Sequence, residues 1–143
     1  MAQYLYNKFK EEMLTGNDVW NTGGTDVFAV QLCHGTQALV NAADPVVGDI
    51  ALPATTNGGE IDPQITTPTF VAGVFKGADV TFTSIDGGGS SGDFDQLMVY
   101  NETSTRLMAL IDINTVGQTG GDIEVQWDTV NTLNNQTGGI FAV

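Results

Sequence analysis

The residues of this chain that could do chemistry gather first in a glycine-rich stretch, residues 83–100, TSIDGGGSSGDFDQLMVY. Asp86, Asp93 and Asp95 surround its glycines, so the stretch could bind an anion on backbone amides or calcium on carboxylates. A phosphate-binding loop needs a following lysine or helix, and here the strand-like run DQLMVY follows. The aspartates also lack the order of an EF-hand loop. We interpret the stretch as an exposed hairpin connection and leave calcium at these aspartates open.

The chain has one cysteine and one histidine, Cys33 and His34, which are adjacent. Neighbouring side chains on a strand point to opposite faces, which works against a Cys-His nucleophilic pair. A zinc site within one chain would need two more soft ligands. We therefore interpret Cys33 as a core residue and His34 as a strand-end residue.

Carboxylates are the remaining catalytic candidates. Asp122, Glu124 and Asp128 lie close together in the sequence. Glycoside hydrolysis needs two carboxylates that face each other across a cleft, whereas neighbours on one strand more often form a solvated face. The sequence therefore predicts no catalytic residue, no cofactor and no resident metal, and we expect that the protein is not an enzyme.

The elements that position these residues are predicted to be mainly strands. Residues 4–14 form the one convincing amphipathic helix, with Leu5, Phe9 and Met13 at positions i, i+4 and i+8. Short apolar or alternating runs separated by turn residues then predict an antiparallel β-sandwich, jelly-roll-like, within a single domain of residues 1–143. The predicted strands are residues 26–33, 69–76, 79–85, 95–101, 106–113, 122–128 and 139–143.

Three stretches carry more specific expectations. Residues 122–128 alternate strictly, which predicts a strand with one solvated face. Residues 106–113 are apolar at both parities, as in a strand covered on both faces. Residues 40–68 hold all four prolines and little periodicity, so we expect a long ordered loop that makes contacts.

The charge balance narrows the possible partners. Four basic residues face seventeen acidic ones, for a formal net charge of −13. Nucleic acid is a poor partner because its recognition needs clustered Lys and Arg, and the same reasoning disfavours an anionic membrane surface. No run approaches the roughly 20 apolar residues of a membrane span. Such a charge favours a surface that faces bulk water.

The order of several short motifs is more informative than any single one. The chain runs through YLYNKFKEEMLTG, GADVTFTSIDGG, QLMVYNETSTRLMALIDI, TGGDIEVQWD and a closing GGIFAV. In this order they resemble a family of small virion structural proteins of tailed bacteriophages, with an opening L-Y-N-K helix and a closing G-G-D-I-x-x-x-W-D strand. The resemblance spans nearly the full length of the chain.

The resemblance implies a virion component without catalytic residues. We expect a capsid decoration, or cement, protein that is made in the host cytoplasm and binds the major capsid protein on the capsid exterior. It would stabilise the shell as a homo-oligomer, most simply a homotrimer at three-fold positions. The alternative is a tail, neck or fibre-associated protein that binds a host surface or glycan.

Two segments are candidate contacts with such a partner. The first is the helix, through Tyr4, Tyr6, Lys8 and Lys10, because an acidic protein on an acidic shell needs its few cations where it meets the partner. Ordinary packing of Phe9 against the sheet is an equally good explanation for that aromatic residue. The second candidate is the proline-containing loop of residues 40–68.

Overall fold

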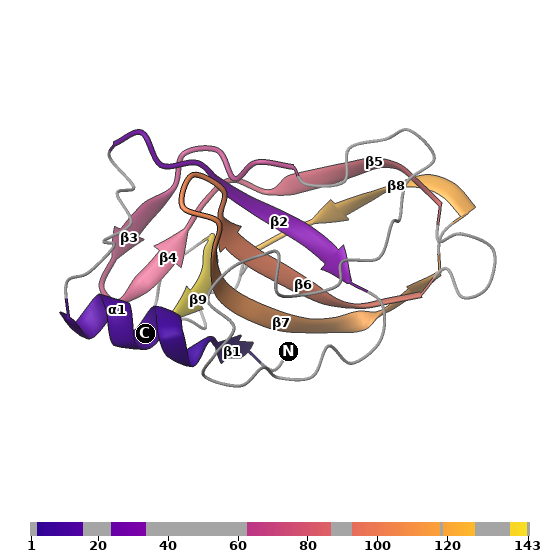
Figure 1. The fold of residues 1–143 in the computed structure, drawn as a ribbon. Helices are drawn as coiled ribbons and strands as arrows, with labels where there is room; N and C mark the ends of the chain where they lie inside the picture. The colour runs from indigo at the N-terminus through magenta and orange to yellow at the C-terminus, as the bar shows by residue number, and fades with distance from the viewer. Residues whose placement is uncertain are drawn as a thin grey trace.

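The computed structural model describes residues 3–15, 24–33, 63–86, 93–117, 119–127 and 138–142, and these contain nine strands and one helix (Figure 1). The predicted class, mainly antiparallel β in a sandwich with one N-terminal helix, is confirmed. The described part of the chain contains no helix with the length and apolarity of a membrane span. The elements are β1 Gln3–Leu5, α1 Asn7–Thr15, β2 Phe28–Cys33, β3 Thr69–Val71, β4 Val74–Lys76, β5 Val80–Asp86, β6 Asp93–Asn101, β7 Arg106–Gly117, β8 Thr119–Val125 and β9 Gly139–Ala142.

The strands form three antiparallel sheets, ordered β1-β7-β6-β2, β3-β4-β9 and β5-β8. In Figure 1 the four-stranded sheet runs through the middle, with β3, β4 and β9 gathered at the end where α1 lies. Buried side chains from all three sheets and from α1 belong to one hydrophobic cluster. The sheets are therefore layers around a common core.

Aromatic rings connect α1 to that core. Phe9 of α1 meets Phe141 of β9 edge-on, with ring centroids 5.9 Å apart. Phe141 stacks on Phe75 of β4 at 5.1 Å, and Phe75 contacts Phe28 of β2 at 5.1 Å. Such pairs contribute about 0.5–1.5 kcal/mol beyond their buried area, so this chain of rings fixes the helix against both larger sheets.

β7 is buried on both faces over its first half. Its residues Leu107 to Ile111 are at most 2% exposed, whichever way their side chains point. Apolar residues at both parities predicted such a strand, and the prediction is confirmed. The strand is also longer than the predicted 106–113, since it continues to Gly117.

β8 has one solvated face, as its alternation predicted. The strand predicted over residues 122–128 is β8, Thr119–Val125, which begins earlier and ends earlier than predicted. Ile123 of β8 is buried, as is Trp127 just beyond the strand, whereas Asp122 and Glu124 are exposed on the other face. The carboxylates considered as a catalytic pair therefore lie beside each other on a wet surface, while Asp128 falls outside the described residues. Alternation of polarity was a reliable guide here because a sheet with one dry face buries every second side chain.

The prediction of one strand over residues 69–76 is wrong, because these residues form the β3–β4 hairpin. The chain reverses at Ala72 and Gly73, whose φ angles are 52° and 78°. Positive φ at both central positions is the signature of a type I′ turn, which matches the twist of the flanking strands. The turn sequence Ala-Gly lacks the Asn or Asp that is usual at its first central position, so residues 69–76 were predicted as one continuous strand.

The predicted helix boundaries of 4–14 are also wrong at the N-terminal end. Gln3–Leu5 form β1, in which Tyr4 pairs with Leu110 of β7, and the helix spans Asn7–Thr15. The backbone amide of Tyr6 still donates to the carbonyl of Met108 at 3.1 Å, so the ladder continues to the helix start. Tertiary pairing with the edge of β7 overrides the local helix preference of these residues.

The end of the predicted 40–68 loop runs beside β2. Gln64 forms a bridge with Ala29, and the amide of Ile65 donates to the carbonyl of Phe28 at 2.7 Å. The carbonyl of Pro63 accepts from the amide of Val30 at 3.2 Å. Residues 63–65 thus extend the four-stranded sheet beyond β2, while residues 40–62 lie outside the described residues.

Candidate functional site

The four residues predicted to contact a partner are not all on the surface. Tyr6 is 4% exposed and belongs to the hydrophobic core, so in this structure its ring packs inside the fold, and its role as a partner contact stays a prediction. Lys10 is exposed on α1. Tyr4 is described only through its backbone in β1, and the side chain of Lys8 lies outside the described set. Phe9 is 5% exposed and packs on the sheets, which confirms the alternative considered for it.

One side of α1 faces the core and the other faces outward. Phe9 and Glu12 are buried and Met13 is partly buried. The residues at positions i, i+3, i+4 and i+7 from the helix start are all exposed, and we call them the outward stripe. They are Asn7, Lys10, Glu11 and Leu14. This stripe contains an anomaly, because Leu14 is 89% exposed on the side of the helix that points away from the core.

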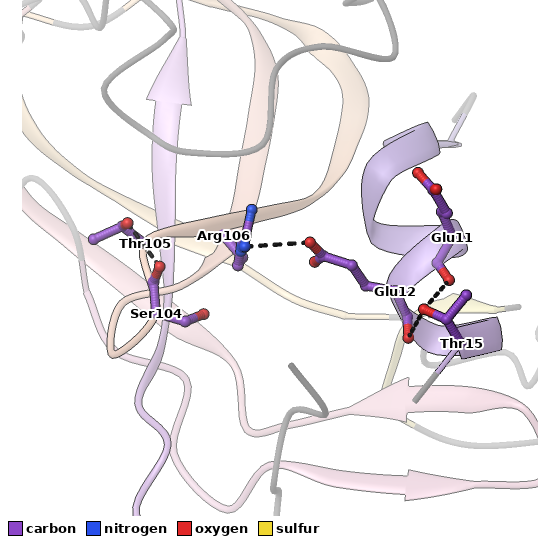
Figure 2. A network of polar contacts seen from close by, with 6 residues as sticks. All are labelled: Glu11, Glu12, Thr15, Ser104, Thr105 and Arg106. Carbon is purple, nitrogen blue, oxygen red and sulfur yellow. Dashed lines mark hydrogen bonds and ion pairs between the residues drawn. The ribbon is translucent and has the colours of Figure 1, made fainter. Parts of the chain in front are cut away.

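An ion pair holds α1 in this orientation. Glu12 extends from the helix toward Arg106 at the start of β7, and Oε1 lies 3.2 Å from Nη2 (Figure 2). The side chains are 10% and 29% exposed respectively, so the pair is largely removed from water. Figure 2 shows that the neighbouring Glu11 leaves the helix in another direction. The pair therefore helps to decide which side of α1 faces outward.

The turn between β6 and β7 places Arg106. Asn101, 4% exposed, donates from Nδ2 to Oδ2 of Asp26 at 3.2 Å and accepts from the amide of Ser104 at 3.2 Å. Thr105 then adopts φ 59°, and its hydroxyl donates to the carbonyl of Ser104 at 2.7 Å (Figure 2). A β-branched residue at positive φ is strained, so the turn that presents Arg106 stores some backbone strain.

The charges of α1 oppose its dipole. The helix has no acidic residue in its first turn and no basic residue in its last turn, and Lys8 and Lys10 lie in its N-terminal half. A cation near a helix N-terminus costs about 0.3–1 kcal/mol where it is not compensated. The C-terminal turn is closed instead by Thr15, whose Oγ1 donates to the carbonyl oxygens of Glu11 at 2.9 Å and Glu12 at 3.4 Å (Figure 2).

The exposed charges of the described residues are mostly carboxylates, and α1 presents one of each sign, Lys10 and Glu11. Lys10 is the exposed cation among the side chains that the structure describes, while Lys76 and Arg106 are partly buried. A single exposed lysine near the exposed Leu14 therefore distinguishes the outward stripe from the rest of this surface. The exposed carboxylates of the described residues are Glu11, Asp79, Glu102, Asp122 and Glu124.

The other sequence candidates remain without a described site. The backbones of Asp86, Asp93 and Asp95 lie in β5 and β6, but their side chains fall outside the described set, so the question of calcium there, left open by the sequence, is not tested. Cys33 ends β2, and its side chain and the whole of His34 are likewise not described. Within the described ranges, no three His, Cys, Asp or Glu residues are grouped so as to hold a metal ion.

The sequence pointed to the correct helix but not to the residue that stands out on it. Phe9 and Met13 of the predicted stripe do lie on the core side of α1, and Leu5 packs on the same core from β1. Because α1 begins at Asn7 and packs on the core through Phe9, Leu14 lies on the side of the helix that faces away from the core. Comparison of the chain with protein-family models, curated proteins and solved structures finds no significant match, so the phage family suggested by the motifs stays a prediction.

Proposed function

We propose that this chain is a virion structural protein of a tailed bacteriophage, and that it decorates the outer surface of the major capsid shell and stabilises it. The observation that carries the proposal is the uneven charge of the described surface. Most of the exposed carboxylates of the described residues lie on strands and turns, whereas the exposed Lys10 is on α1, beside the exposed Glu11. An acidic exterior suits a face that stays in water, while a local cation suits the face that meets an acidic shell.

The mechanism is the burial of surface across neighbouring capsid subunits. A stable interface buries about 800 Å² on each partner, which a compact module of this size can supply from one end. As a homotrimer at a three-fold position, the protein would attach by three equivalent contacts, so that each bound contact raises the effective concentration of the others. The shell would then resist outward pressure because adjacent subunits are clamped together.

The test uses particles that lack only this protein. We expect such particles to assemble with DNA-filled heads and tails, and to release their DNA at a lower temperature than the wild type in a dye-accessibility melt. Adding the purified protein back should restore the wild-type release temperature. Heads of unchanged heat stability would contradict the proposal. Intact heads without tails, or particles that fail to adsorb to the host, would favour the tail or neck alternative instead.

A further inference from the structure

We propose that residues 3–15, which we call the N-terminal arm, detach from the fold as a unit and dock at the same place on a second copy of this chain. The arm consists of β1, Tyr6 and α1. Its binding site, which we call the arm site, is formed by β7 and β9 (Figure 1). The partner is an identical protomer, and the exchanged arms join the copies of an oligomer. This inference goes beyond the proposed function, because it concerns how copies hold each other wherever the protein works.

The order of the strands makes the arm separable. In the sheet β1-β7-β6-β2, β1 is the edge strand beside β7, and β2, the element that follows α1 in the sequence, lies on the far side of β6. The ladder of β1 runs against Ala109–Ile111, and the amide of Tyr6 extends it by donating to the carbonyl of Met108 at 3.1 Å. Removing the arm therefore leaves the β7-β6 and β6-β2 ladders intact.

The arm site is built from residues far from the arm in the sequence. Phe141 of β9 meets the ring of Phe9 with centroids 5.9 Å apart, and Arg106 of β7 lies 3.2 Å from the carboxylate of Glu12. Phe141 also stacks on Phe75, so the core holds it in place without the arm. An empty arm site leaves a sheet edge uncovered, and such an edge readily pairs with another strand. The segment whose fit to this edge the structure shows is the arm, so the occupant is the arm of a second copy.

The helix of the arm depends on docking for its stability. α1 has nine residues, whereas isolated helices shorter than about 12–15 residues are marginal in water. It has no acidic residue in its first turn and no basic residue in its last turn, so its charges do not complement its dipole. Tyr6 and Phe9 are 4% and 5% exposed in the docked arm, and detachment exposes both rings to water. A detached arm therefore redocks, in its own chain or in a neighbour.

Docking in the same chain and in a second copy makes the same contacts, so the local concentration of arms decides between them. Tethering raises the effective concentration of an arm at its own site, commonly to the millimolar range, and close packing of copies raises it at a neighbour's site. The net charge of −13 on each copy opposes their approach, and salt screens this repulsion. Exchange should therefore increase with protein concentration and with salt.

The experiment traps exchanged arms by a disulfide between chains. Leu5 lies directly opposite Ala109 in the β1–β7 ladder, a spacing that a disulfide can bridge. One full-length sample carries Leu5→Cys and another Ala109→Cys, both with Cys33→Ser, and the two are mixed, incubated and oxidised. Thr81→Cys mixed with Glu124→Cys is the matched control, because these residues face each other across β5 and β8, outside the arm. We expect at least about tenfold more mixed covalent dimer by mass spectrometry than in the control, since a docked arm holds the two thiols together.

Two further samples complete the test. A single chain with both Leu5→Cys and Ala109→Cys should form the disulfide internally, which checks the geometry. Adding Glu12→Gln to the mixed samples should speed dimer formation at least about fivefold, because it breaks the ion pair that holds the arm, whereas Glu102→Gln should leave the rate unchanged. An internal disulfide without mixed dimer above the control would overturn the inference, as would failure of the internal disulfide to form. Neither result bears on the proposed function, which particles that lack the protein test separately.

Discussion

Replacing Glu12 by Gln tests how the fold orients α1. The change preserves the shape of the side chain but removes its charge, and Arg106 is left without the carboxylate 3.2 Å away. Exposed pairs contribute about 0.2–1 kcal/mol, and breaking a fully buried pair costs about 3–5 kcal/mol. At 10% and 29% exposure the Glu12–Arg106 pair lies between these cases, so we expect a loss of about 1–3 kcal/mol. That loss corresponds to a decrease in Tm of roughly 3–10 °C for a domain of this size.

The assay is a double-mutant cycle with Glu12→Gln, Arg106→Met and both changes together, measured by urea unfolding. We expect a coupling energy of about 1 kcal/mol or more. Glu102→Gln is the matched control, because Glu102 accepts an exposed hydrogen bond from Gln64 and its charge should matter by less than about 0.5 kcal/mol. A coupling energy indistinguishable from zero would refute the claim that this pair fixes α1.

Two other substitutions test local features of the fold. Gly77→Ala should destabilise the protein by about 1–3 kcal/mol, since the new methyl group would overlap Cγ2 of the buried Ile65. In the same unfolding assay, the double variant Gly77→Ala, Ile65→Ala should lose less stability than the sum of the losses of the two single variants. Thr105→Gly should stabilise it by about 1 kcal/mol by relieving the strain at φ 59°, and a lower Tm would show that the turn is not strained.

Patterns that reflect one sheet face or one core were readable in the sequence. β8 alternates because a single face of it is dry, and the first half of β7 is apolar at both parities because both of its faces are covered. In both strands the side chains that must be buried decide the pattern, so polarity alone predicted the environment. The side of α1 that faces the core was predicted for the same reason, because its apolar residue Phe9 packs against the sheets.

Features that depend on partners distant in the sequence were not readable. Tyr4 could continue a helix, and it joins a strand only because the edge of β7 offers it a backbone ladder at Leu110. The hairpin requires φ 52° at Ala72, a value that alanine rarely adopts, so the presence of alanine gives no sign of a turn. The exposure of Leu14 likewise follows from where the helix starts and what it packs on, not from the residue itself.

The most direct test of the account is the number of copies of this protein in each virion, counted by quantitative mass spectrometry of purified particles against the major capsid protein. A decoration protein at three-fold positions of the shell predicts on the order of hundreds of copies, in a fixed ratio to the capsid subunits. About six to twelve copies per particle, the symmetry of a tail or neck ring, would contradict it.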